Sequence, residues 1–274
     1  ACKRKRLMNQ EVASPMERAA YIPAERQKKM IEYVEAKTSA QIHELAAYFQ
    51  VSEATVRRDL DELDQQGALR RTHGGAIKME RSTSYEQQYS EKMILMTEEK
   101  RRIAARAAQL VHTGDTVIVD AGTTGFFIAQ ALSHHENLTI ITNDLYTAYQ
   151  TPLHPSSTMV VAGGTRRRDH HELTGTLTEN FLREVRVDLA FVCVDAIDLT
   201  GGVTTTNFAE LGVKRLMLEA AMRSVIAADH TKFGRVALAR ICDLKDVDLL
   251  LTDSALNPEM LARIRKLPVE IELA

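Results

Sequence analysis

The sequence has few cysteines, no long apolar run and no large excess of charge of one sign. Cys2, Cys193 and Cys242 are too few and too scattered for a disulfide framework and include no C-x-x-C pair for zinc, so we expect a reducing compartment, the cytoplasm. No apolar run approaches the roughly 20 residues of a membrane span. The 35 basic and 37 acidic residues give a formal charge of −2. This balance excludes a wholly basic nucleic-acid coat but allows a local basic face.

Targeting signals and internal repeats are also missing from the sequence. The basic run Lys3–Arg6 is not followed by an apolar stretch, so no signal peptide is predicted and residues 1–22 are expected to form a basic, disordered tail. No fixed-period repeat is visible, which excludes a solenoid. The composition, 45% hydrophobic and 26% charged, is that of a folded globular protein, and 274 residues predict about two domains.

The first 80 residues predict three helices followed by a two-stranded hairpin. Apolar residues recur there at helical spacing, Ser39 and Ser52 can cap the second and third helices, and Gly67 suits the end of the third. The connection between the second and third helices is only about two residues long. The expected helices cover 24–36, 40–49 and 53–66, and the expected strands cover Ala68–Thr72 and Ala76–Lys78.

This order of elements is typical of a winged helix-turn-helix domain, expected over residues 23–78. In such a domain the third helix enters the major groove, and the wing reaches the backbone or the minor groove. Arg57 and Arg58 can bond guanine or phosphate, although a solvated helix face paired with Asp61 and Glu62 also fits them. The candidate DNA-contacting residues are Ser52, Glu53, Thr55, Arg57 and Arg58 on the helix, and Arg70, Arg71 and His73 on the wing.

The remainder of the chain predicts a mainly parallel, doubly wound α/β domain over 97–274. Residues 79–96 are polar and predict a linker, part of it helical, and from Thr97 onward helices alternate with apolar strands. The expected helices cover 97–112, 126–132, 144–150, 174–185, 214–222 and 259–266, and the expected strands cover 116–120, 138–142, 158–162, 189–194, 224–228 and 247–251.

Glycines and polar residues follow five of these strands. Ligands of open parallel sheets gather at the carboxyl ends of the strands, so we expect one site there. The loop 122–125 can bind an anion with its N–H groups and hydroxyls, although it also fits a plain strand-to-helix turn. Together, phosphate donors and hydroxyl acceptors suit a phosphorylated sugar. The candidate site residues are Asp120, Gly122, Thr123, Thr124, Asn143, Gly163, Gly164, Asp195, Thr204, Asn207, Glu210, Lys214 and Lys232.

Two groups of motifs resemble the DeoR family of bacterial transcription regulators. Residues 52–76 resemble the DNA-binding signature of that family. The resemblance covers 23–274 and implies a cytoplasmic repressor of a sugar-catabolism operon, a sensor domain similar to ribose-5-phosphate isomerase, and a phosphorylated sugar as inducer. The segments that resemble the sensor domain are Asp120–Thr124, Thr142–Asn143, Gly163–Gly164, Val194–Ala196, Gly202–Thr205 and Asp229–Gly234.

Two other functions stay open at this point. One is a sugar-phosphate isomerase with an appended DNA-binding domain, in which Asp120, Asp195 and Glu210 act as general bases beside Lys232. The other is a DNA-binding protein whose second domain binds no ligand. The expected partners are double-stranded operator DNA, a phosphorylated sugar and further copies of the chain in a homodimer or homotetramer, with no metal and no cofactor. The sequence does not decide whether the effector induces or corepresses.

Overall fold

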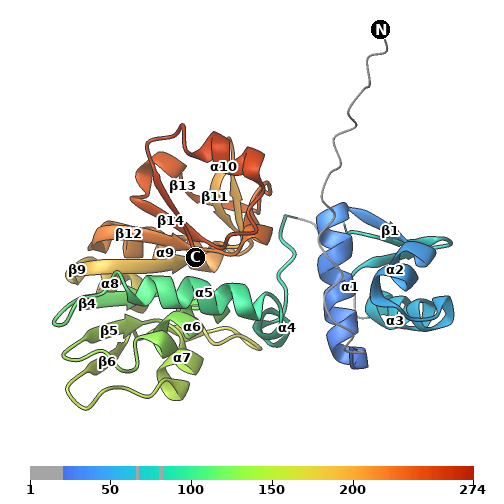
Figure 1. Cartoon of the computed structure of the whole chain (residues 1–274). Coiled ribbons are helices and arrows are strands. Elements are labelled where there is room, and N and C mark those ends of the chain that lie inside the picture. The colour runs from blue at the N-terminus through green and yellow to red at the C-terminus, as the bar shows by residue number, and fades with distance from the viewer. Residues whose placement is uncertain (1–20, 66–67, 80–82) are drawn as a thin grey trace, which may run out of the picture. The chain divides into compact units, whose positions relative to one another are not determined.

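The computed structural model describes residues 21–65, 68–79 and 83–274. The chain divides into two compact units, residues 1–80 and residues 81–274, each of which is described by itself (Figure 1). The expected tail lies outside the described residues except for its last two positions. The expected helix end at Gly67 lies outside them as well.

The first unit packs three helices against a small antiparallel sheet. Met30, Leu45 and Leu60, one from each helix, are fully buried in its core. The strand order is β1-β3-β2, so the first strand of the unit pairs with the last. The elements are α1 (Pro23–Lys37), β1 (Ser39–Gln41), α2 (Ile42–Phe49), α3 (Glu53–Gln65), β2 (Arg70–Thr72) and β3 (Gly75–Ile77).

One predicted cap is right in this unit and the other is wrong. Ser52 Oγ accepts a hydrogen bond from Thr55 N at 3.1 Å and caps α3 as expected. Ser39 does not cap α2, because it is the first residue of β1, which pairs with the wing. Gln41 is the cap instead, and it forms a capping box with Glu44. The prediction failed because nothing in a three-residue segment distinguishes this strand from a helix start.

The second unit is built on a seven-stranded parallel sheet (Figure 1). The strand order is β15-β14-β12-β9-β4-β5-β6, and each neighbouring pair is parallel. Both faces of the sheet are buried, since Val117 and Val119 pack into one apolar cluster and Ile118 into another. The strands are β4 (Thr116–Val119), β5 (Thr139–Thr142), β6 (Thr158–Val161), β9 (Val187–Cys193), β12 (Ala221–Ala227), β14 (Leu249–Thr252) and β15 (Glu270–Leu273).

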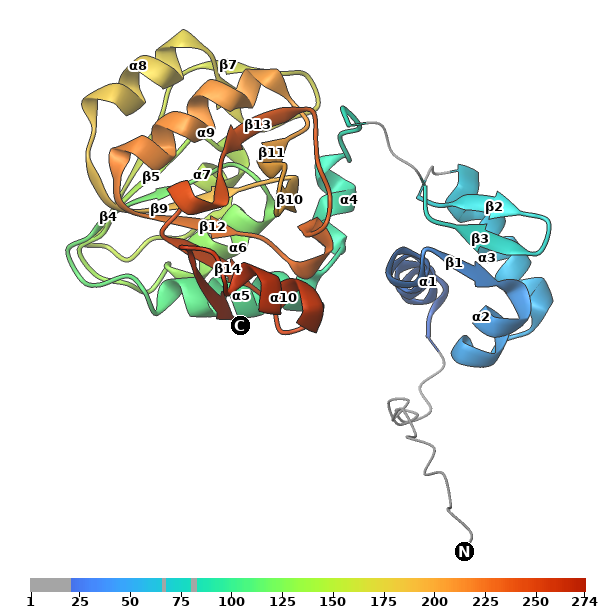
Figure 2. The same cartoon turned by 90° about the horizontal axis from the view of Figure 1, so that it is seen from above.

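Helices cover the two faces of this sheet, as a doubly wound fold requires (Figure 2). Ile103 of α5 and Ile128 of α6 join one cluster, and Leu182 of α8 and Met217 of α9 join the other. The expected fold class, a helix-turn-helix domain followed by a parallel α/β domain, is thereby confirmed. The helices are α4 (Tyr89–Ile94), α5 (Thr97–Ala108), α6 (Thr123–Ala131), α7 (Leu145–Gln150), α8 (Thr176–Glu184), α9 (Phe208–Ala220), α10 (Pro258–Ile264), η1 (His230–Lys232) and η2 (Leu244–Asp246).

Several features of the second unit differ from the sequence prediction. The start of α9 was expected at Lys214 but lies at Phe208, where Asn207 caps the helix with its Oδ1, which accepts from Ala209 N at 3.0 Å. The edge strand β15 was not predicted. Two short antiparallel sheets were also missed, β10-β11-β13 and β7-β8. Their strands are β7 (Thr165–Arg166), β8 (Leu173–Thr174), β10 (Ala196–Asp198), β11 (Gly202–Thr205) and β13 (Ala239–Cys242).

The described helices are all short compared with a bilayer. The longest, α1, has 15 residues, and no described helix combines the length and the apolar character that crossing a membrane requires.

Candidate functional site

The exposed start of α3 carries the predicted DNA-contacting arginines. Arg57 Nη2 donates to Glu53 Oε2 at 2.7 Å, one turn earlier on the same helix, rather than to Asp61. Arg58 is exposed and forms no ion pair with any residue that the structure describes. An exposed ion pair at this spacing is worth only about 0.3–0.5 kcal/mol, so a phosphate or a guanine can replace Glu53 at little cost. Both guanidinium groups are therefore accessible to DNA.

The wing presents its charged residues in two different ways. Arg70 and His73 are exposed. Arg71 instead contacts the side chain of Asp61, and its N–H donates to Asp64 Oδ1 at 2.9 Å. Arg71 thus ties the wing to α3, which leaves Arg70 as the more accessible cation of the predicted pair.

A buried ion pair, not singled out from the sequence, fixes α3 against α1. Arg26 Nε donates to Asp59 Oδ2 at 2.6 Å, and Arg26 Nη2 donates to Oδ1 at 3.1 Å. Both residues are almost fully buried, with exposed fractions of 8% and 3%. Two parallel hydrogen bonds fix a guanidinium and a carboxylate in one geometry, so the pair sets how α3 lies on α1.

The second predicted site lies where the order of the strands reverses. The chain passes through β4, β5 and β6 toward one edge and then returns to β9, on the other side of β4. In an open parallel sheet the crevice outside the carboxyl ends of two such strands is the usual ligand position. Asp120 follows β4 and Asp195 lies just after β9, so both residues occur at this reversal.

Asp120 and Lys214 form a buried ion pair at this reversal. Lys214 Nζ donates to Asp120 Oδ2 at 2.6 Å and to Cys193 O at 2.9 Å. Burial raises the pKa of Asp120 to about 6, although the ammonium group opposes this. Burial alone would lower the pKa of Lys214, but Asp120 and Glu210 raise it well above its ordinary value. The ammonium group therefore stays charged, whereas burial raises the pKa of the Cys193 thiol to about 12 and keeps it neutral.

Asp195 is an ionised carboxylate with several donors around it. It accepts from Thr206 N at 3.0 Å, from Thr205 Oγ1 at 3.1 Å and from Lys92 Nζ at 3.2 Å. Burial would raise the pKa of Asp195, but the charges of Lys92 and Lys232 and the Thr206 N–H lower it well below its ordinary range. Asp195 is thus an acceptor at any physiological pH.

Glu210 joins these two parts of the site. Its Oε2 lies 3.2 Å from Lys214 Nζ and 3.4 Å from Thr205 Oγ1. Its Oε1 accepts from Asn207 Nδ2 at 3.3 Å and lies 3.9 Å from Arg167 Nη2. The network that runs from Asp120 through Lys214 and Glu210 to Asp195 is called the effector-site network below.

The start of α6 lies at the same end of β4. Gly122 has φ +128°, a conformation that a side chain would strain, and Thr123 and Thr124 open the helix directly after it. A Cβ on Gly125 would lie 2.1 Å from Asp120 O, so the first turn of α6 packs directly on the end of β4. The first N–H groups of a helix lack partners within it and bind anions readily.

Two predicted site residues have side chains that bond the backbone instead. Asn143 accepts from Ala121 N at 2.9 Å and donates to Leu173 O at 3.2 Å. The Thr204 hydroxyl accepts from Ala237 N at 2.8 Å. Their hydrogen bonds stabilise the loops at this end of the sheet, and their contact with a ligand stays a prediction.

Among the described residues, no hydrogen bond or ion pair joins Gly163, Gly164 or Lys232 to the network. A Cβ on Gly164 would lie 2.2 Å from Thr178 Oγ1, whereas a Cβ on Gly163 would meet no atom within 4 Å. Gly164 therefore permits a close approach of two segments, and Gly163 does not need to be glycine for space. Lys232 makes no ion pair with a described residue, but its charge lowers the pKa of Asp195.

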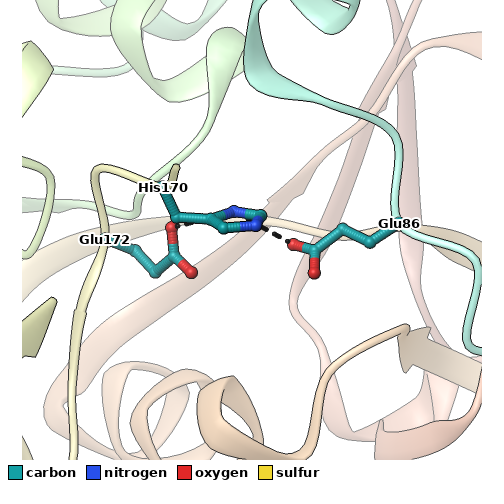
Figure 3. Close-up of side chains that lie close together, drawn as sticks. All are labelled: Glu86, His170 and Glu172. Carbon is teal, nitrogen blue, oxygen red and sulfur yellow. Dashed lines mark ion pairs between the residues drawn. The ribbon is translucent and has the colours of Figure 1, made fainter. Parts of the chain in front are cut away.

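A second group of charged residues lies beside this network and was not among the predicted site residues. Arg167 Nη2 donates to Glu86 Oε1 at 2.9 Å and to Glu172 Oε1 at 2.8 Å. His170 Nδ1 lies 3.5 Å from Glu86 and 3.6 Å from Glu172. Figure 3 shows the imidazole between the two carboxylates. These four residues are called the Arg167 cluster. The imidazole and the two carboxylates are spaced for a metal ion, but the guanidinium already supplies the positive charge between the carboxylates.

Comparison with known families matches both units. Residues 26–82 match the DeoR-like helix-turn-helix domain, and residues 95–254 match the DeoR C terminal sensor domain. The chain belongs to the DeoR family of transcriptional regulators. DeoR-family proteins similar to it include the regulator GolR of Listeria innocua, with 32% identity over 91% of this chain and 98% of that one. The glycerol-3-phosphate regulon repressor of Escherichia coli is 33% identical over 84% of this chain and 90% of that one.

A further relative and one solved structure are also similar to this chain. The putative aga operon transcriptional repressor of Escherichia coli O157:H7 is 34% identical over 91% of this chain and 93% of that one. Ribose 5-phosphate isomerase from Plasmodium falciparum aligns with a TM-score of 0.35 and 15% identity over 49% of this chain and 52% of that one. A likeness at this level carries no argument about function.

Membership of the DeoR family decides between the functions that the sequence left open. The relatives are named as transcriptional regulators and repressors, so this chain is a DNA-binding regulator and not an isomerase with an appended DNA-binding domain. The family match does not decide what the second unit binds.

Sequence reasoning missed Lys92, Glu86 and Arg167 in this DeoR-family site for identifiable reasons. Lys92 and Glu86 lie in a polar segment that predicts a linker, yet the structure places residues 83–96 in the second unit. Arg167 belongs to a visible basic run, but its partner Glu86 is 81 positions away. Local patterns carry no signal for a pairing at that distance.

Proposed function

We propose that this regulator represses a sugar-catabolism operon and leaves its operator DNA when a phosphorylated sugar binds the second unit. The Arg57 and Arg58 side chains of α3 read the operator, with Arg70 of the wing on the DNA backbone. The protein acts as a homodimer or homotetramer in the cytoplasm, because duplicated α3 helices suit operators with repeated or palindromic half-sites.

One observation carries the effector part of the proposal. The effector-site network places donors for an anion beside acceptors for hydroxyls, at the point where the strand order reverses. Lys214 and the first turn of α6 supply positive charge and N–H groups, and Asp195 and Glu210 supply ionised oxygens. A phosphorylated sugar carries both complementary groups, a phosphate and several hydroxyls. One relative, the glycerol-3-phosphate regulon repressor of Escherichia coli, is named for a small phosphorylated compound, which agrees with a phosphorylated ligand.

The switch requires a large difference in ligand-binding free energy between the two states of the protein. To change a population from 1:99 to 99:1, a ligand must bind one state about 5.5 kcal/mol more tightly than the other. Contacts to a phosphate group that exist in one state only can supply much of this difference, since charge-assisted hydrogen bonds are the strong ones.

A gel-shift experiment on the DNA upstream of the protein's own gene tests the proposal. We expect a specific complex that one phosphorylated sugar of a panel dissociates, while the same sugar without phosphate does not. Titration calorimetry of the full-length chain with the same panel measures the binding directly. Binding of none of the phosphorylated sugars would show that the second unit is ligand-free, and a sugar phosphate that strengthens the complex would make the effector a corepressor.

A further inference from the structure

The segment that directly follows the first unit in the chain contacts the effector site through two charged side chains, Glu86 and Lys92. Glu86 precedes α4 and contacts Arg167, and Lys92 on α4 contacts Asp195. The two pairs are opposite in sense, since the segment contributes an anion in one and a cation in the other. Residues 83–96 are therefore a charged edge of the effector site and not a spacer outside it.

The contact between Glu86 and Arg167 has the geometry of an anion-binding site. Arg167 Nη2 donates to both carboxylate oxygens of Glu86 at 2.9 Å. The side chain of Arg167 keeps an exposed fraction of 34%, so a solute can reach it. A phosphate group offers a guanidinium the same pair of acceptor oxygens as a carboxylate, with more charge.

Arg167 also lies next to the effector-site network. Its Nη2 is 3.9 Å from Glu210 Oε1, and Glu210 in turn contacts Lys214. Arg167 Nε and Nη2 both donate to Glu172 Oε1, at 3.1 and 2.8 Å. Glu172 therefore orients the guanidinium even when Glu86 is absent, and the Nη2 group that faces Glu86 becomes available for another anion.

The charges in the Arg167 cluster favour an exchange of anions over the addition of a cation. One guanidinium faces the carboxylates of Glu86, Glu172 and Glu210. A divalent cation between Glu86 and Glu172 would lie against the guanidinium, which repels it. An incoming phosphate that replaces Glu86 preserves the pairing and restores a second anion to Arg167.

We propose that Arg167 is an anion-binding residue of the effector site and that Glu86 is a built-in anion that the phosphate of the effector displaces. This inference rests on the proposed function, because it names a further residue of the same site. Displacement of Glu86 breaks its contacts with Arg167 and His170 and leaves the pair of Lys92 with Asp195 as the other charged contact of residues 83–96. Ligand binding is thereby coupled to the part of the chain that leads from the DNA-binding unit.

Inorganic phosphate is the probe that tests this assignment on the full-length chain, because it carries the anion without a sugar. Glu86→Gln keeps the shape of the side chain and removes the competing charge, so we expect phosphate to bind at least 10-fold more tightly by calorimetry. We expect Arg167→Gln to bind at least 10-fold more weakly. Glu91→Gln removes the same charge from the same segment without an ion pair to a described residue, and we expect wild-type affinity for this control.

Hydrogen exchange gives a second readout that a purely structural role for Glu86 would not produce. Phosphate is expected to accelerate amide exchange in residues 83–94 of the wild type, and to leave the exchange in Glu86→Gln unchanged, because this variant has no carboxylate for the phosphate to displace. If Arg167→Gln does not fold, Arg167→Lys is measured in its place. We expect Arg167→Lys to bind phosphate more weakly than the wild type and more tightly than a variant without a cation at this position.

Three results would overturn the inference. One is equal phosphate affinity in Glu86→Gln and the wild type. Another is an unchanged affinity in Arg167→Lys, which would show that the planar guanidinium is not used. The third is binding of Mg²⁺ or Zn²⁺ alone to the wild type that Glu86→Gln abolishes, which would make the cluster a metal site. In each case, a sugar phosphate that still dissociates the DNA complex leaves the proposed function intact. If no phosphorylated compound binds at all, the inference about Arg167 and the proposed function are both contradicted.

Discussion

Arg57 and Arg58 are neighbours on α3 but have different partners. The guanidinium of Arg57 is paired with Glu53 before any DNA arrives, and that of Arg58 has no ion pair among the described residues. Glu53 was predicted as a DNA-contacting residue. In the DNA-free protein its carboxylate orients Arg57, which is a role that the residue type alone does not reveal.

Arg57→Ala is expected to weaken binding to the operator by about 1–3 kcal/mol, because a guanidinium that bonds a guanine contributes that much discrimination. Fluorescence anisotropy with operator and random DNA measures the loss on each. Arg263→Ala removes an exposed arginine from the second unit and is the matched control. An equal loss on operator and random DNA would mean that Arg57 contacts only phosphate.

His230 predicts a pH dependence of stability in the second unit. Its Nδ1 lies 2.9 Å from Asp253 Oδ1, and this hydrogen bond raises the pKa of His230 above the ordinary 6.5 although burial opposes the shift. A raised pKa means that the folded state binds the proton more tightly than the unfolded state. The stabilisation is therefore complete below pH 6.5 and is lost as the pH rises through the folded pKa.

We expect His230→Gln to lower the unfolding temperature of the second unit more at about pH 6 than at about pH 9, where the imidazole is neutral in both states. Calorimetric melting of the variant and the wild type at both pH values measures this, and an NMR titration of the His230 ring should have its midpoint above 6.5. Equal losses at the two pH values would contradict the assignment.

At the scale of the element, the first turn of α6 depends on one close approach to β4. Gly125→Ala would raise helix propensity, but its Cβ would lie 2.1 Å from the backbone oxygen of Asp120. The backbone must shift to relieve so short a contact. We therefore expect a loss of about 3 kcal/mol in the unfolding free energy of the second unit. Weaker sugar-phosphate binding is expected with it, because α6 borders the site.

Gly163→Ala is the control for that substitution, since its Cβ meets no atom within 4 Å and φ there is not in the left-handed region. Chemical denaturation and calorimetry of both variants give the comparison. The packing argument fails if the two variants lose the same stability.

Elements with strong apolar patterns could be predicted from the sequence, and elements without them could not. The buried strands β4, β5 and β9 and the amphipathic helix α5 were found because each carries its own signal. β1 and β11 were not found, since neither has an apolar run of its own and each is defined by its partners elsewhere in the chain, Gly75–Ile77 in the case of β1.

The presence or absence of a local sequence signal also explains which site residues could be predicted. Asp120 and Asp195 were found because a rule about strand ends places them, and the structure brings both into one network with Lys214 and Glu210. The role of Arg167 was missed because no general rule joins it to a glutamate 81 positions earlier.

At the scale of the whole molecule, each unit has a core of its own. The buried residues of the first unit form one cluster, and those of the second form two clusters on the faces of the sheet. We expect two unfolding transitions in a calorimetric scan, the first unit stabilised by operator DNA and the second by a sugar phosphate. A ligand at 100 times its Kd adds about 2.7 kcal/mol to the stability of the unit that it binds. A single transition that both ligands shift would show that the two cores unfold together.

The net charge of −2 describes neither unit well. The first 80 residues carry 14 basic and 12 acidic side chains, so the DNA-binding part is slightly basic within an acidic chain. Its affinity for DNA therefore depends on where a few arginines lie, and on the number of copies that meet at the operator, more than on total charge.

The buried pair of Arg26 and Asp59 limits how this DNA-binding unit can be re-engineered. A designer who grafts a foreign reading helix onto the scaffold would replace residues 53–65 and remove Asp59 with them. Arg26 would then remain buried without its counter-ion, which costs about 3–5 kcal/mol, a large part of the stability of a small domain. A workable chimera must transplant α1 and α3 together or keep aspartate at position 59, and evolution faces the same constraint whenever it changes operator specificity through α3.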